Sequence, residues 1–85
     1  MSFESPNDLS RFIDQLRADL EHSGLHAAAQ HLAAVQGAAF TTGSEWLGEL
    51  GLAVNDIRAK WTVPVDLNAK LERIKREVRR AWPDL

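Results

Sequence analysis

The stretch Phe40-Thr41-Thr42-Gly43-Ser44-Glu45-Trp46-Leu47-Gly48-Glu49-Leu50 organises the chain, because it combines a turn with the start of a helix. Thr42 and Glu45 have the spacing of a capping box, in which their side chains accept hydrogen bonds from the first free N–H groups of the helix. Trp46 begins an apolar face that continues at helical spacing through Leu47, Leu50, Val54 and Ile57. We therefore predict a helix over about residues 43–60, with Thr42, Glu45 and Trp46 as its structural anchor.

Two helical segments precede this anchor. The first is predicted over about residues 6–22, with Ser5 as N-cap and an apolar face of Leu9, Phe12, Ile13, Leu16 and Leu20. Gly24 is expected to end it in the left-handed conformation of a C′ residue. The second helix is predicted over about residues 25–36. It is rich in alanine, so it can approach a neighbour closely but buries little apolar surface.

A last helix is predicted over about residues 64–82. Pro64 restricts Val63 to extended conformations, so the preceding helix should end near Trp61. The last helix then begins at Pro64 as its first residue, or after Asp66 as N-cap. Its apolar stripe is the most regular in the chain and comprises Leu67, Leu71, Ile74, Val78 and Ala81/Trp82.

Together these segments predict an all-α fold: one compact four-helix domain, for which a helical bundle is one arrangement. Gly48 and Gly51 lie inside the third predicted helix, where each costs about 1 kcal/mol relative to alanine. Close packing at positions where a Cβ would clash is one explanation. A flat surface for a partner is the other.

Composition narrows the class of protein. The chain has no cysteine, so it can form neither a disulfide nor a thiolate metal site. No run reaches the ~18 apolar residues of a membrane span, and residues 1–8 lack the features of a secretory signal. We therefore expect a cytoplasmic protein that does not enter the membrane.

The net charge of −2 conceals an asymmetry along the chain. Residues 1–57 carry two arginines against eight carboxylates, a net charge of −6, whereas residues 58–85 carry eight Lys or Arg against four carboxylates, a net charge of +4. This charge can be balanced within one molecule, between copies, or by an acidic partner.

Three groups of polar residues are candidates for a chemical site. His22, His26 and His31 lie near the first helix junction, but a break between the helices separates them, and we interpret them as surface or capping residues. Residues 41–44 resemble an anion cradle without the lysine of a phosphate-binding loop. Glu45, Glu49 and Asp56 give no sign of the burial that acid–base catalysis needs. We therefore predict no enzyme activity, no cofactor and no metal.

The basic face of the last helix is the best functional candidate. It carries Arg73, Arg76, Arg79 and Arg80 beside Lys70 and Lys75, interrupted by Glu72 and Glu77. Glu72 and Arg76 have the spacing of an i,i+4 ion pair. A charged helix face is most often solvated, but arginines in this density can also bind a partner's carboxylates or phosphates.

The layout resembles a group of small, functionally uncharacterised, all-helical bacterial proteins in which a Gly–Ser/Thr–Glu turn opens the third helix. The resemblance rests on Gly43-Ser44-Glu45, Leu47, Leu50, Ile57, Pro64, Leu67, Leu71 and Ile74. It implies a bacterial, cytoplasmic origin and no catalytic residue.

From these patterns we expect a protein-interaction or regulatory module without catalysis. We favour a homodimer, because the alanine-rich second helix supplies few large side chains to cover the stripe of the last helix. The alternative is a nucleic-acid-binding module that uses the basic face of the last helix. The pI of about 5.8 ranks this alternative lower.

Overall fold

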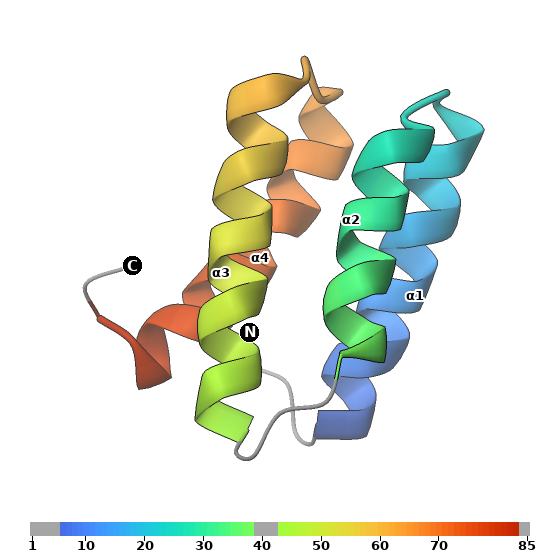
Figure 1. Ribbon diagram of the computed structural model, residues 1–85. Coiled ribbons are helices and arrows are strands. Elements are labelled where there is room, and N and C mark those ends of the chain that lie inside the picture. The colour runs from blue at the N-terminus through green and yellow to red at the C-terminus, as the bar shows by residue number, and fades with distance from the viewer. Residues whose placement is uncertain (1–5, 39–42, 84–85) are drawn as a thin grey trace.

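The described part of the chain forms four α-helices, and successive helices run in alternating directions (Figure 1). The computed structural model describes residues 6–38 and 43–83. Its helices are α1 (Pro6–His22), α2 (His26–Gly37), α3 (Gly43–Lys60) and α4 (Val65–Ala81). The described residues contain no strand. The prediction of an all-α, four-helix fold is therefore confirmed.

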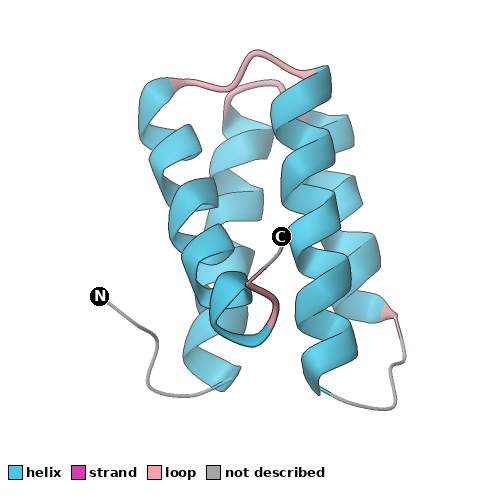
Figure 2. Cartoon of the chain, turned by 90° about the vertical axis from the view of Figure 1, so that its left-hand side faces the viewer, coloured by secondary structure: helices cyan, strands magenta, loops and turns pink. Residues whose placement is uncertain are grey.

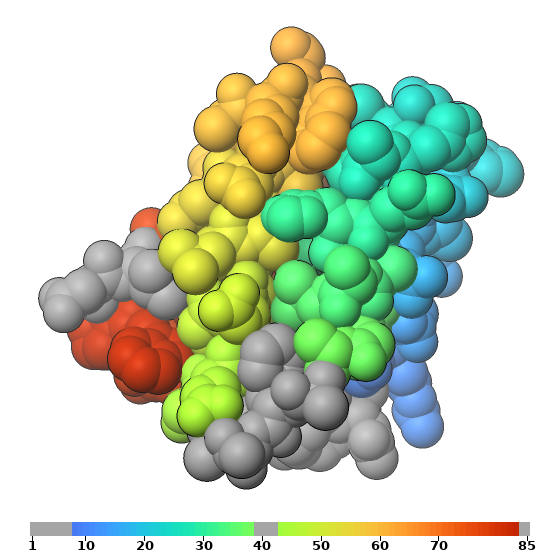
Figure 3. Space-filling view, in the orientation of Figure 1, coloured from blue at the N-terminus to red at the C-terminus, as the bar shows by residue number. Residues whose placement is uncertain are grey.

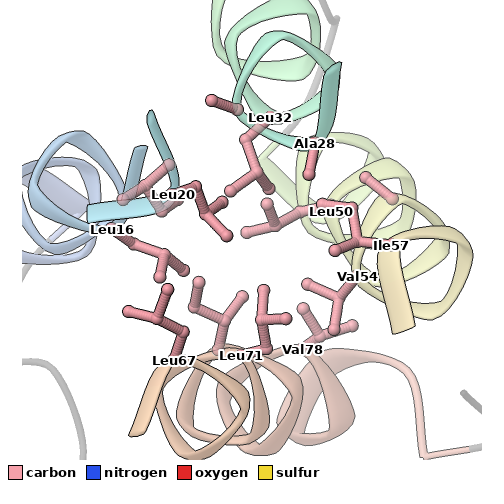
Figure 4. Close-up of a cluster of buried hydrophobic side chains, with 14 of the residues drawn as sticks. Leu16, Leu20, Ala28, Leu32, Leu50, Val54, Ile57, Leu67, Leu71 and Val78 are labelled. Atoms are coloured by element: carbon pink, nitrogen blue, oxygen red, sulfur yellow. The ribbon is translucent and has the colours of Figure 1, made fainter. Parts of the chain in front are cut away.

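The helices form a closed ring around one hydrophobic core. α1 contacts α2, α2 contacts α3, α3 contacts α4, and α4 returns to α1. All four contribute side chains that point to the centre (Figure 4). The largest fully buried ones are Ile13, Leu16, Leu20, Leu32, Leu50, Val54, Ile57, Leu71, Ile74 and Val78. Because the stripe of α4 is already covered within one chain, the argument that a second copy is needed to cover it is wrong.

The helix ends differ slightly from the sequence-based bounds. α2 begins at His26 and ends at Gly37, each one residue later than predicted, and Leu25 is its N-cap. Pro64 is the N-cap of α4 rather than its first residue, because its ψ of 149° is extended, and Asp66 already lies within the helix. Trp82 leaves the helix with a φ of −130°, so α4 ends at Ala81.

Gly24 makes the turn between α1 and α2 in the left-handed conformation, with a φ of +82°. Its N–H donates to the Glu21 carbonyl at 3.0 Å, and the N–H of Leu25 donates to the Leu20 carbonyl at 2.8 Å. These bonds satisfy carbonyls that the end of a helix leaves free. The predicted role of Gly24 is confirmed.

Polar side chains tie each neighbouring pair of helices together around the core. The contacts are Arg17–Gln36 at 2.8 Å between α1 and α2, His31–Asp56 at 3.5 Å between α2 and α3, Arg58–Glu72 at 2.7 Å between α3 and α4, and Lys70–Asp19 at 2.6 Å between α4 and α1. The apolar core drives the packing, and these contacts fix which helix faces lie opposite one another.

The predicted anchor of α3 is described only in part. Thr42 lies outside the described residues, so its capping bond stays a prediction. Glu45 is exposed in the first turn of α3. Trp46 is half-buried and packs against the core, as its place on the apolar face requires.

Candidate interaction surface

The four arginines of the predicted basic face have different surroundings. Arg76 and Arg80 are exposed on the side of α4 that faces away from the core, and Arg79 is exposed nearer to α3. Arg73 is half-buried, with its guanidinium carbon 4.6 Å from the centre of the Phe12 ring on α1. The structure thus gathers Arg76, Arg79 and Arg80 on the last turns of α4, whereas a cation–π contact draws Arg73 toward α1.

α3 and α4 pair in one antiparallel register along their whole length. Arg58 meets Glu72, Asn55 meets Lys75, and Gly48 meets Trp82, so each step back along α3 matches an equal step forward along α4. Arg79 lies one turn after Lys75 and donates to Glu72. Leu52 lies one turn after Gly48 on the exposed side of α3. We include both in the same strip. We call this strip the α3–α4 seam; its members are Gly48, Leu52, Asn55, Arg58, Glu72, Lys75, Arg79 and Trp82. Figure 2 shows the molecule from the side on which α3 and α4 lie next to each other.

Lys75 is a buried charge in the middle of the seam. The residue is 4% exposed, and its Nζ donates a hydrogen bond to Oδ1 of Asn55. Burial lowers the pKa of Lys75, and the positive charge of Arg79 lowers it further. A buried ammonium group held by an amide rather than a carboxylate is costly, because its charge is not neutralised by that bond.

Glu72 is the carboxylate of this cluster. It accepts hydrogen bonds from Arg58 at 2.7 Å and from Arg79 at 3.4 Å. The expected ion pair of Glu72 with Arg76 is wrong, because Glu72 turns toward α3 instead. Arg58, protonated Lys75 and Arg79 contribute three positive charges against one negative, so the cluster has a net charge of +2.

The end of the seam that contains Gly48 and Trp82 is apolar. The Nε1–H of Trp82 donates to the carbonyl oxygen of Ser44 at 2.6 Å, and the residue remains 42% exposed. A Cβ added to Gly48 would lie 3.4 Å from Nε1 of Trp82, which is an ordinary contact. The expectation that a Cβ would clash is therefore wrong at Gly48, and Trp82 is not the buried end of the α4 stripe.

Exposed apolar side chains gather on this half of the molecule. Among the described residues, the large hydrophobic side chains with high exposure are Leu52, Val65 and Trp82, and all belong to α3 or to α4 and its end. Figure 3 shows the end of α4 in red against the early part of α3 in yellow-green. Leu52 and Trp82 lie on the seam, whereas Val65 lies at the opposite end of α4.

The other candidate residues form no recognisable chemical site. Within residues 6–38 and 43–83, no group of three His, Cys, Asp or Glu side chains is placed to hold a metal ion. Nε2 of His31 lies 3.5 Å from Oδ2 of Asp56 without a hydrogen bond, and Glu45, Glu49 and Asp56 are exposed.

Sequence reasoning did not place Leu52, Asn55, Arg58, Lys75 and Trp82 in one strip, and it did not predict that Lys75 is buried. Lys75 carried a weak signal, because it lies four residues after Leu71 and three before Val78, at the edge of the apolar stripe. The partners of Lys75 and Trp82 depend on the register between α3 and α4. No local pattern encodes that register.

None of the described helices is both long and apolar enough to cross a membrane. No protein-family model matches the chain, and no curated protein or solved structure matches it.

Proposed function

We propose that this protein is a protein-interaction module without catalysis, which binds an acidic surface of a partner through Arg76, Arg79 and Arg80. The observation that supports the proposal is that these side chains form only weak ion pairs within the chain. Arg79 reaches Glu72 and Arg80 reaches Glu77 at 3.4 Å, both near solvent. Arg76 forms no ion pair with any residue that the structure describes. Exposed pairs of this kind contribute about 0–1 kcal/mol, so a partner's carboxylates can replace them at little cost.

A regulatory role is consistent with this proposal, because a domain without catalytic activity can regulate a process only through the partner that it binds. Self-association is a second form of the proposal. The acidic residues that precede Arg58 would then supply the carboxylates in a homodimer. Because the apolar stripe of α4 is already buried within one chain, burial of apolar surface does not argue for such a dimer. Only the opposite charges of the two parts of the chain support it.

Nucleic acid is the alternative partner, because the same arginines can neutralise phosphates. Four phosphate contacts, from these three arginines and Arg73, would give a log–log salt slope of roughly −3 to −4. A duplex carries about one negative charge per 1.7 Å of its axis. The exposed carboxylates of Glu45 and Glu49 on α3 therefore repel it more strongly than they repel an acidic protein surface, within a Debye length of about 8–10 Å. We therefore rank the protein partner first and expect no measurable duplex binding at 150 mM salt.

A comparison of affinity captures tests the proposal. The tagged protein, Arg76→Gln/Arg79→Gln and Arg11→Gln/Lys60→Gln are each incubated with nuclease-treated lysate of the native organism, and the bound proteins are quantified by mass spectrometry. Both double variants change the net charge from −2 to −4, and Arg11 and Lys60 are exposed away from the last turns of α4. The control Arg11→Gln/Lys60→Gln therefore separates the effect of the position of the lost charges from the effect of the total charge.

We expect an acidic protein to be retained by the wild type and by Arg11→Gln/Lys60→Gln, and to be lost from Arg76→Gln/Arg79→Gln. Equal recovery on all three proteins contradicts the proposal. A fluorescence-anisotropy titration with a labelled duplex runs in parallel. Submicromolar, salt-sensitive binding to the duplex at 150 mM salt promotes the nucleic-acid alternative.

A further inference from the structure

We propose that the α3–α4 seam receives an acidic amphipathic helix of a partner protein. The carboxylates of this helix would meet Arg58 and Arg79, above the buried charge of Lys75, and its apolar side chains would meet Leu52 and Trp82. The inference rests on the proposed function and deepens it, because it moves the centre of binding from the outer face of α4 to the strip between α3 and α4.

The charge of the seam points to carboxylates. Lys75 is 4% exposed and its ammonium group is held by an amide, while Glu72 is shared between Arg58 and Arg79. A carboxylate laid over the strip would meet a net charge of +2 without displacing any buried apolar side chain. Charge-assisted hydrogen bonds to arginine and lysine are the stronger ones in proteins, and they gain further when water is excluded.

The apolar end of the seam points to a protein rather than to phosphates. Leu52 is 49% exposed and Trp82 is 42% exposed, and Gly48 places no side chain between them and solvent. A sugar–phosphate backbone presents no apolar side chain that could pack against a leucine. An amphipathic helix presents apolar residues at i, i+3 or i+4, and i+7. Tryptophan and arginine are also the residues that most often dominate the energy of protein interfaces.

The dimensions of the seam fit a short helix. From Arg58 to Gly48 the strip follows ten residues of α3, which at 1.5 Å per residue is about 15 Å, or nearly three helical turns. Cations occupy one end of this length and apolar groups occupy the other. A bound helix would therefore have one preferred direction.

A second copy of this chain fits the seam less well. A two-fold axis along the strip sets the cationic end of one copy against the cationic end of the other, so a net charge of +2 faces another +2. Opposed like charges of this kind disfavour an interface. A two-fold axis across the strip lays the cationic end of one copy on the apolar end of the other, where the cations meet no carboxylate.

The test uses the full chain and a synthetic probe. The probe is an acetylated 18-residue helical peptide with leucine at positions i, i+4, i+7 and glutamate on both flanks of that face. Its control has glutamine at every glutamate. Binding is measured by the chemical-shift changes of the ¹⁵N-labelled protein at 150 mM salt, where the indole N–H of Trp82 and the amides of Leu52, Asn55 and Arg79 report on the seam.

Two matched pairs of variants locate the site. Arg79→Gln is compared with Arg11→Gln as its control, since both arginines are exposed and only Arg79 belongs to the seam. Arg80→Gln is measured separately to test the outer face of α4. Leu52→Ser is compared with Val65→Ser, since both side chains are exposed. We expect Arg79→Gln and Leu52→Ser each to weaken binding about fivefold, and their controls to change it less than twofold.

The outcomes separate this inference from the proposed function. Shifts on the seam that vanish with the glutamine peptide support both. If Arg79→Gln and Arg80→Gln weaken peptide binding equally, and the chemical-shift changes lie on the outer face of α4, the seam is not the binding site. The proposed function is then still supported. Absence of peptide binding at both 150 and 25 mM salt overturns both. A concentration-dependent dimer in sedimentation experiments that Arg79→Gln dissolves assigns the seam to a second copy and overturns the inference.

Discussion

The indole Nε1–H of Trp82 donates a hydrogen bond to the main-chain oxygen of Ser44, which lies 38 residues earlier in the chain, at 2.6 Å. The bond ties the residue that follows α4 to the first turn of α3. Because Trp82 stays 42% exposed, the bond orients an aromatic surface without burying it. Such an oriented ring loses little conformational freedom when a partner covers it.

Replacing Trp82 by phenylalanine should lower the free energy of unfolding by about 0.5–1 kcal/mol, because the ring is kept but its hydrogen bond is lost near the surface. Urea denaturation measures the change. Val65→Ala serves as control, because Val65 is 87% exposed and should alter stability very little. An unchanged midpoint for Trp82→Phe would show that the bond to Ser44 contributes nothing.

Two glycines should respond to alanine in opposite directions. Gly48→Ala should raise the free energy of unfolding by up to about 1 kcal/mol, because the helix gains propensity and the new Cβ meets Trp82 at an ordinary contact distance. Gly24→Ala should lower it by about 1 kcal/mol or more, because its φ of +82° strains any residue with a Cβ. Thermal or urea melts compare the two, and a loss of stability in Gly48→Ala contradicts the described packing.

The contact of Asp19 with Lys70 should make stability depend on acid pH. The hydrogen bond from Lys70, and next that from Gln15, holds the pKa of Asp19 below its ordinary value in the folded state. The stabilisation is therefore complete above the unfolded pKa of about 3.9 and is lost as the pH falls through the lower, folded value. The difference in urea midpoint between wild type and Asp19→Asn should stay constant from pH 7 to 5 and shrink below pH 4. Lys70→Met should remove that dependence, and a gap that persists at pH 2 would refute it.

Lys75 should make stability depend on pH on the alkaline side, with the same sign as Asp19 on the acid side. Burial lowers the pKa of Lys75 in the folded state, so between that lowered pKa and the ordinary lysine pKa of about 10.5 the unfolded chain binds more protons. Wild-type stability should therefore rise with pH in this window relative to Lys75→Met, which has no proton to lose. At pH 7 Lys75→Met should be at least as stable as wild type, because it removes a buried charge. Denaturation from pH 7 to 10.5 tests this, and a constant gap between the two proteins counts against the burial of Lys75.

Much of the fold could be predicted from the sequence because it depends on local spacing. Leu71, Ile74 and Val78 recur at helical intervals and are all fully buried. Gly24 is required for a turn that an ordinary residue strains, so its role was also predictable. Helix ends near Pro64 were less certain, because one residue can serve either as a cap or as the first helical residue.

The seam was less predictable, because its members come from two helices. Helical spacing placed Arg76 and Arg80 correctly on the outer side of α4. The same spacing did not show that Glu72 turns to Arg58 or that Lys75 meets Asn55, since both contacts depend on how α3 and α4 are aligned. An alignment between helices is set by the sum of many side-chain contacts and leaves no short motif.

The closed ring of helices also has a consequence for how the chain folds. Three of its four contacts join helices that are neighbours in sequence, and only the contact between α1 and α4 spans most of the chain. Loop-closure entropy is therefore small for the α1–α2 and α3–α4 hairpins and large only for the final closure. Local topology of this kind is associated with folding in microseconds to milliseconds. Lys70 and Asp19, 51 residues apart, belong to the step that completes the ring, so weakening their contact should speed unfolding more than it slows folding.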